Sequence, residues 1–125
     1  MGSIPLESGK GVAFRVWAPN ADAVSVIGTF NDWNSEAHPL EREDGDTWYG
    51  VVPDAAVGHD YKYHLRAGEH EFDRIDPRAR KVTNSVGNGV VWLSQSGDAR
   101  GEGNSFQIPT QDQLVIYELH IGSFH

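Results

Sequence analysis

Apolar residues recur at every second position in several short stretches of the chain. In the first stretch, Val12, Phe14 and Val16 share one face, and Arg15 and Trp17 lie on the other. A period of two predicts a β-strand, because successive side chains of a strand point to opposite faces of its sheet. Turn-forming residues close each such stretch, which indicates short strands joined by tight turns.

The same pattern predicts about seven strands in total. They lie at residues 12–17, 23–27, 38–42, 47–52, 61–65, 69–74 and 90–93. Pro39 would place its strand at a sheet edge, because proline has no N–H to donate to a neighbouring strand. No stretch shows the helical period, and residues 75–89 are expected to be irregular. The pattern therefore predicts an all-β fold, an immunoglobulin-like antiparallel β-sandwich.

The chain also divides into segments of different composition. Residues 1–8 are interpreted as an N-terminal tail and residues 9–93 as the sandwich. Residues 94–113 begin with small and polar side chains and are interpreted as a linker. Residues 114–125 begin with an almost continuous apolar run, which is typical of a strand buried on both faces. We interpret that run as the start of a second, truncated domain, and the alternative is a last strand of the same sandwich.

The composition argues against several classes of function. The net charge is −8 and the isoelectric point is near 5.0, so nucleic acid is not an expected partner, because phosphate binding needs a basic surface. The chain has no cysteine, which excludes disulfides and thiolate chemistry and fits a cytoplasmic protein. A membrane is not an expected partner either, because no apolar run reaches the roughly 18 residues of a membrane span. The start of the chain also lacks the pattern of a secretory signal.

No cofactor and no metal ion are expected. The six histidines lack both the spacing of a helical histidine pair and a cysteine partner. His64 and His70 have Glu69 and Glu71 nearby, but a solvated, charge-balanced hairpin accounts for that arrangement. No glycine-rich phosphate-binding pattern precedes a helix.

The loop after the second predicted strand contains the most informative residue, Trp33. Tryptophan is usually at least partly buried, yet Trp33 lies between Asp32 and Asn34 in a segment whose composition predicts a turn. Two interpretations stay open. Either Trp33 folds back onto the core, or it offers a flat apolar face to a sugar ring, with Asn31 and Asn34 placed to bind the hydroxyl groups.

Several segments together resemble one known family. They read Phe14-Arg15-Val16-Trp17-Ala18-Pro19-Asn20-Ala21, Gly28-Thr29-Phe30-Asn31-Asp32-Trp33, Gly45-Asp46-Thr47-Trp48, Gly58-His59-Asp60-Tyr61-Lys62-Tyr63 and Asp76-Pro77-Arg78-Ala79. In this order they resemble the amino-terminal β-sandwich of glycoside hydrolase family 13 enzymes, the α-amylase superfamily. This sandwich is called the early-set domain or carbohydrate-binding module family 48, and the resemblance covers about residues 9–93.

A second resemblance lies at residues 115–124, which are similar to the first strand of the catalytic (β/α)8 barrel in branching enzymes and related α-glucan enzymes. The pair His38-Pro39 makes a 1,4-α-glucan branching enzyme the most similar parent. Debranching enzymes, trehalose-releasing hydrolases and α-amylases are the alternatives. The family's catalytic carboxylates lie on later barrel strands, so the resemblance implies that this chain is a non-catalytic accessory domain that packs on the barrel of the full-length protein.

The resemblance also implies a weak site for α-1,4-glucan or maltooligosaccharide. In sugar-binding members of the family, the tryptophan that matches Trp33 stacks on a glucose ring, and the lysine that matches Lys62 takes part. A second aromatic residue usually follows the hairpin turn near Gly68. The nearest substitutes in this chain are His70 and Phe72. The alternative is a purely structural domain that orients the barrel and has no sugar site.

Overall fold

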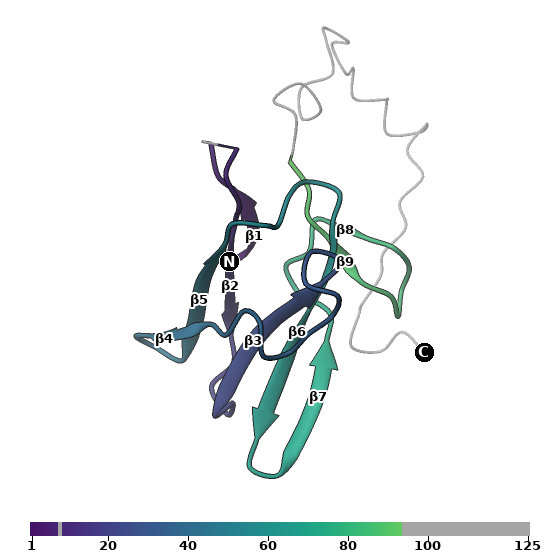
Figure 1. Cartoon of the computed structure of the whole chain (residues 1–125). Helices are drawn as coiled ribbons and strands as arrows, with labels where there is room; N and C mark the ends of the chain where they lie inside the picture. Colours follow the sequence, from purple (N-terminus) through teal and green to yellow (C-terminus); the bar gives the residue numbers. More distant parts are fainter. Residues whose placement is uncertain (8, 94–125) are drawn as a thin grey trace, which may run out of the picture. The chain divides into compact units, whose positions relative to one another are not determined.

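The computed structural model describes residues 1–7 and 9–93, and within them the chain forms β-strands and no helix (Figure 1). The strands are β1 (Gly2–Pro5), β2 (Val12–Trp17), β3 (Ala23–Gly28), β4 (Glu41–Glu43), β5 (Thr47–Val52), β6 (Asp60–Ala67), β7 (His70–Arg74), β8 (Lys81–Val82) and β9 (Gly89–Val90). In this described part, no helix is long and apolar enough to cross a membrane.

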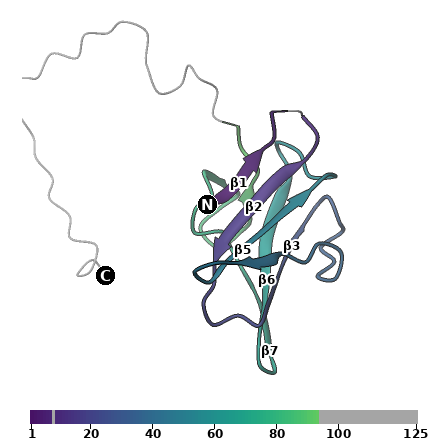
Figure 2. The ribbon, with the colours of Figure 1, turned by 90° about the vertical axis from the view of Figure 1, so that its left-hand side faces the viewer.

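These strands form two antiparallel sheets that face each other (Figure 2). The four-stranded sheet has the order β1-β2-β5-β4, and the five-stranded sheet has the order β3-β6-β9-β8, with β7 also paired to β6. Strand β3 pairs with one edge of β6, and β7 and β9 pair with different parts of its other edge. The β6–β7 hairpin extends beyond the end of the four-stranded sheet (Figures 1 and 2). The predicted all-β antiparallel sandwich is confirmed.

The core lies between the sheets and is made by the alternating positions of the strands. Val12, Phe14 and Val16 of β2 are buried, as the sequence pattern predicts. From the opposite sheet, Tyr61 and Tyr63 of β6 are also buried. The ring of Phe14 contacts that of Tyr61 edge-on, with 5.1 Å between centroids. Such aromatic contacts join the two sheets over a small number of large side chains.

The segment that carries Pro39 crosses from one sheet to the other. Pro39 bridges to Ser25 of β3, and the chain then enters β4, which pairs with β5 in the opposite sheet. Leu40 lies between these two contacts and is buried in the core. The predicted edge strand at residues 38–42 therefore corresponds to β4 at the edge of the four-stranded sheet, preceded by a crossing segment.

Three short strands differ from the expectation. Residues 1–8 are not only a tail, because β1 pairs along its length with β2. Residues 75–89 were expected to be irregular, but they contain β8. The last strand is β9 at Gly89–Val90, and Trp92 and Leu93 lie outside it. Such short pairings depend on neighbouring strands, so they leave no alternating pattern in the sequence. The predicted linker at 94–113 and the predicted barrel strand at 114–125 lie outside the described residues.

A buried carboxylate holds one end of the five-stranded sheet together. Asp76 is only 3% exposed, and its Oδ2 accepts hydrogen bonds from the hydroxyls of Tyr61 at 2.6 Å and Tyr63 at 3.5 Å. Its Oδ1 accepts from the backbone N–H of Arg78 at 2.7 Å. Burial, and next the charge of Asp76, raise the pKa of the Tyr61 and Tyr63 hydroxyls well above that of a free tyrosine.

These two tyrosines should make the protein less stable in alkali. Their pKa values are raised in the folded protein, so above the unfolded value of about 10 only the unfolded chain releases those protons. The stability that they contribute is fully present below that pH and is lost as the pH rises further. We expect the free energy of unfolding to fall by roughly 1 kcal/mol per pH unit per tyrosine, measured by urea denaturation. In Tyr61→Phe the slope should be about half as steep, and an unchanged slope would contradict this account.

Candidate functional site

The loop that presents Trp33 has a strained backbone. Asp32 and Trp33 have φ angles of 52° and 60°, in the left-handed region that bulky residues rarely adopt. The N–H of Trp33 donates to the carbonyl oxygen of Gly28 at 3.0 Å, which closes the loop onto the end of β3. Gly28 itself is required, because a Cβ there would lie 2.2 Å from the Asp60 carbonyl oxygen. Surrounding contacts must therefore hold this conformation in place.

The side chain of Asn31 supplies most of those contacts. Its Oδ1 accepts from the N–H of Gly28 at 2.9 Å, and its Nδ2 donates to the carbonyl oxygen of Val26 at 3.0 Å. The same Nδ2 lies 2.9 Å from His38 Nδ1 and 3.4 Å from the carbonyl oxygen of Asn34. Asn31 is also one of the predicted glucan contacts, and in the structure its amide bonds the backbone of its own loop. Asn31 is a positioning residue for Trp33.

Trp33 and Lys62 approach the same region of the five-stranded sheet. The Trp33 residue is 39% exposed. Lys62 pairs with Ile27 of β3. The next residue of β3 is Gly28, whose carbonyl oxygen accepts the hydrogen bond from the Trp33 N–H. Asn34 follows directly, and its Oδ1 accepts from the N–H of Glu36 at 2.9 Å. An exposed indole therefore lies at the end of β3, close to the strand position of an ammonium group.

The outward face of β6 is polar along its length. Tyr61 and Tyr63 point into the core, so the alternate residues Asp60, Lys62, His64 and Arg66 point outward. His64 Nδ1 lies 2.8 Å from Asp73 Oδ1, and its Nε2 lies 3.9 Å from Glu71 Oε2. Asp60 Oδ2 accepts from Asn88 Nδ2 at 3.2 Å. This row offers both donors and acceptors beside Trp33.

The β8–β9 turn contributes a residue that sequence analysis missed, Val86. It is 87% exposed, although its turn is well ordered by hydrogen bonds. Asn84 Oδ1 accepts from the Val86 N–H at 3.0 Å, and the N–H of Asn88 donates to Thr83 Oγ1 at 2.9 Å. The bond from Asn88 to Asp60 anchors this turn beside the row that contains Lys62. The sequence signal that could have identified Val86 is the same as for Trp33, an apolar side chain within a polar turn.

His70 and Phe72 do not join this group. They pair with Ala67 and Leu65, whose side chains lie on the core side of β6, opposite to Lys62. Phe72 instead lines a hollow of about 220 Å³ together with Trp17 and Leu65. The two-residue turn of the hairpin sets the pairing register, and that register decides which face each side chain takes. The structure thus places Asn31, Trp33 and Asn34 in one loop at the end of β3, where the strand position of Lys62 pairs with Ile27. His70 and Phe72 lie on the opposite face of β6 from Lys62.

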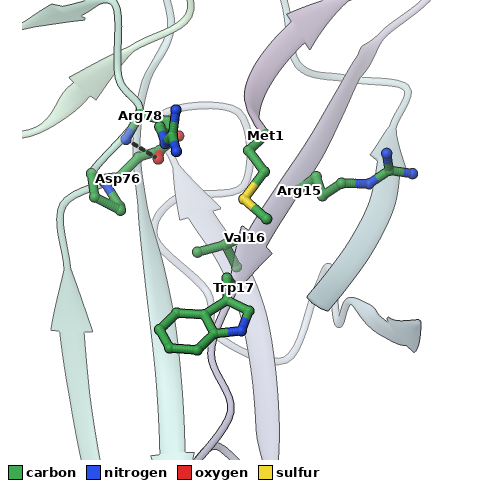
Figure 3. A pocket seen from close by; sticks show the side chains of 7 residues that line it. Met1, Arg15, Val16, Trp17, Asp76 and Arg78 are labelled. Atoms are coloured by element: carbon green, nitrogen blue, oxygen red, sulfur yellow. Dashed lines mark hydrogen bonds between the residues drawn. The ribbon is translucent and has the colours of Figure 1, made fainter. Parts of the chain in front are cut away.

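A second exposed tryptophan lies beside a different hollow. Trp17 is 59% exposed and borders a hollow of about 330 Å³, where its side chain and that of Val16 lie opposite Met1 (Figure 3). Pro77 also contributes to the lining, and the hydrogen bond between Asp76 and Arg78 lies at one side. Met1, Val16, Trp17 and Pro77 give the hollow an apolar part, and Arg15, Asp76 and Arg78 complete its lining. Such a surface suits the packing of another protein surface.

Similarity to known proteins agrees with the fold. The family Carbohydrate-binding module 48 (Isoamylase N-terminal domain) matches residues 1–79. The fold and the exposed-tryptophan loop define an accessory β-sandwich module of the kind attached to carbohydrate-active enzymes. The chain belongs to carbohydrate-binding module family 48.

Curated relatives include 1,4-alpha-glucan branching enzymes. The enzyme of Salinibacter ruber is 41% identical over 99% of this chain, which corresponds to 21% of that enzyme. The enzyme of Deinococcus radiodurans is 38% identical over 92% of this chain and 17% of its own length. The enzyme of Aquifex aeolicus is 37% identical over 97% of this chain and 20% of its own length. The chain thus spans about a fifth of the length of the curated relatives it matches.

Solved structures with the same fold include pullulanase from Paenibacillus barengoltzii. Without ligand, it matches with a TM-score of 0.63 and 24% identity, over 74% of this chain and 14% of that chain. Its complex with maltohexaose and alpha-cyclodextrin matches with a TM-score of 0.61 and 25% identity, over 73% and 14%. The first comparison shows the shared fold, and the second adds that this pullulanase binds maltooligosaccharides.

Removing the Asn31 side chain should loosen the Trp33 loop. Asn31→Ala leaves the Gly28 N–H and the Val26 carbonyl without their side-chain partners, so we expect the free energy of unfolding to fall by about 2 kcal/mol. The indole resonance of Trp33 in an NMR spectrum should shift as well. Asn34→Ala is the graded control, because its side chain makes the one bond to Glu36 and should cost less than about 1 kcal/mol. Equal costs in the two variants would argue against the role of Asn31.

Proposed function

We propose that this chain is a non-catalytic N-terminal accessory domain of an α-glucan-active glycoside hydrolase family 13 enzyme, and that it binds α-1,4-glucan weakly at Trp33. The parent that we favour is a cytoplasmic 1,4-α-glucan branching enzyme, in which other parts of the protein carry out the catalysis. Support comes from the family match and from the branching enzymes among the relatives. The observation that carries the binding proposal is the strained, well-anchored loop that holds Trp33 partly exposed at the end of β3. The last residues of β3 pair with the strand position of Lys62.

The chemistry of this site suits a neutral sugar chain. The Trp33 indole offers an apolar face for the C–H face of a glucose ring. Lys62 and the side-chain nitrogen of Asn34 are placed to donate hydrogen bonds to hydroxyl oxygens at the edge of that ring. Val86, which extends from the β8–β9 turn, supplies a small apolar contact on the far side of Lys62. None of these side chains requires the ligand to carry a carboxylate or a phosphate.

The expected affinity is low, and the function does not require more. One ring stack contributes about 0.5–1.5 kcal/mol beyond its buried area, by analogy with aromatic pairs. Each hydrogen bond adds about 1 kcal/mol. Together these terms correspond to a dissociation constant near millimolar, or about −4 kcal/mol. When such a module is attached to an enzyme, it keeps a polymer at high effective concentration near the active site.

Maltoheptaose should bind to the 125-residue chain and depend on Trp33. We expect saturable amide shifts with a dissociation constant on the order of millimolar, weakened at least about tenfold in Trp33→Ala and about fivefold in Lys62→Ala. Trp17→Ala is the matched control, because Trp17 is an exposed tryptophan that lies elsewhere. Absence of any shift at tens of millimolar, or equal loss in the control, would refute the proposed binding function.

A second candidate function rests on the apolar surface around Trp17. In this alternative, the domain has no ligand and stabilises the catalytic barrel by packing against it. The surface includes hollows on both sides of Trp17, lined by Met1 and Pro77 on one side and by Leu65 and Phe72 on the other. A stable interface commonly has an apolar, aromatic centre of this kind.

An experiment on the full-length enzyme distinguishes the two candidate functions. If Trp17 packs against the barrel, Trp17→Ser should lower the melting temperature by about 1–2 °C, because burial of an aromatic side chain contributes about 1.5–3 kcal/mol and the shift per kcal/mol becomes smaller in a long chain. Val51→Ser is the control, since Val51 is another exposed apolar residue, on β5. Equal melting temperatures for the two variants would count against the packing role and leave the sugar-binding proposal intact.

A further inference from the structure

A polar hollow lies on the same outward face as Lys62, on the side away from Asp60. Its volume is about 220 Å³. The polar side chains that line it are those of Ser25, Ser35, Glu36, His64, Arg66 and Glu71. Two of them come from the segment that directly follows Trp33 and Asn34 in the chain. The hollow is therefore next to the Trp33 site along both the loop and strand β6.

The walls of this hollow are held in place before any ligand binds. Asn34 Oδ1 bonds the N–H of Glu36 and so shapes the corner that contains Ser35. The bridge between Pro39 and Ser25 ties the loop to the edge of β3. His64 is oriented by Asp73, at 2.8 Å from its Nδ1. Preorganised groups lose little conformational entropy when they bind a ligand, which favours even weak binding.

The groups in the hollow match the hydroxyls of a neutral sugar. When His64 Nδ1 donates to Asp73, its Nε2 is an acceptor, and it lies 3.9 Å from the acceptor Glu71 Oε2. Two neighbouring acceptors can receive hydrogen bonds from a vicinal pair of sugar hydroxyls. Arg66 lines the same hollow and donates to hydroxyl oxygens. The carboxylates disfavour an anionic ligand.

The size and spacing of the hollow limit the ligand to one ring of a longer chain. Pockets for drug-sized ligands occupy about 300–1,000 Å³, so the volume here suits a single hexose. Lys62 and His64 are two positions apart on β6, or about 7 Å along the strand. A ring beside Lys62 and a ring in the hollow can therefore belong to one continuous glucan.

We propose that this hollow is a second glucose subsite, which takes a further ring of the glucan chain held at Trp33. It gives the domain hydrogen-bonding contacts along the outward face of the sheet. This inference rests on the proposed function, because a chain must first be held at Trp33. It makes the affinity depend on chain length, since a short oligosaccharide fills the Trp33 site alone.

NMR titrations of the 125-residue chain with maltotriose and maltoheptaose test the subsite. We expect the affinity for maltoheptaose to exceed that for maltotriose, and the amides of Ser35 and Glu36 to shift with maltoheptaose but not with maltotriose. Glu71→Ala should weaken maltoheptaose binding about fivefold and change maltotriose binding less than about twofold. Glu69→Ala is the matched control, because Glu69 is an exposed glutamate of the same hairpin that does not line the hollow.

The possible outcomes separate this inference from the function on which it rests. If maltoheptaose shifts Trp33 but leaves Ser35 and Glu36 unchanged, the hollow is not a subsite and the Trp33 site stands. The same conclusion follows if Glu71→Ala binds maltoheptaose as tightly as Glu69→Ala. If maltoheptaose shifts neither region, both proposals are wrong. Equal melting temperatures of the two variants ensure that a lost contact, and not a change in folding, is measured.

Discussion

The buried carboxylate of Asp76 is the contact on which the rest of this sandwich depends. It lies in the segment after β7 and accepts hydrogen bonds from two core tyrosines of β6. It also lies next to β1, because a Cβ on Gly2 would come within 3.5 Å of its Oδ2. A buried charge is costly unless it is fully hydrogen-bonded. Asp76 is compatible with folding only when these separate parts of the chain meet around it.

The same strand β6 serves the core and the candidate binding face. Tyr61 and Tyr63 point inward to Asp76, so Lys62 and His64 must point outward. Their outward position is thus a consequence of how the core is anchored. On this face, the Asn31 amide organises the loop that presents Trp33. The domain therefore combines a rigid sheet with a loop whose side-chain bonds fix an otherwise unfavourable backbone conformation.

Several features could be predicted from the sequence because they depend on local patterns. The alternation of Val12, Phe14 and Val16 predicted β2 and its buried face, and both are confirmed. Likewise, the residues around Gly68 predicted the hairpin of β6 and β7, which is confirmed. Trp33 and Lys62 were singled out from their motifs as glucan contacts, and that role stays a prediction.

Other features depend on the partner that each residue meets in the fold. The sequence of residues 69–74 allowed either face for Phe72, and only the pairing of Phe72 with Leu65 decided it. Strand β1 has too few residues to show a pattern and exists because β2 offers it an edge. Asn31 looked like a ligand contact until the loop was seen to close around its amide. A polar side chain in a turn can bind either the backbone or a ligand, and its neighbours in space decide which.

By itself, the sequence determined the positions of the longer strands, the all-β class and the turn that contains Trp33, because each depends on residues close together in the chain. The tertiary structure decided the crossing of the Pro39 segment between the sheets, the burial of Asp76, and the hollow formed by Glu36, His64 and Glu71. These features require contacts between distant segments. Their geometry is set by how the two sheets pack, and a one-residue change in register would move every side chain of a strand to the opposite face.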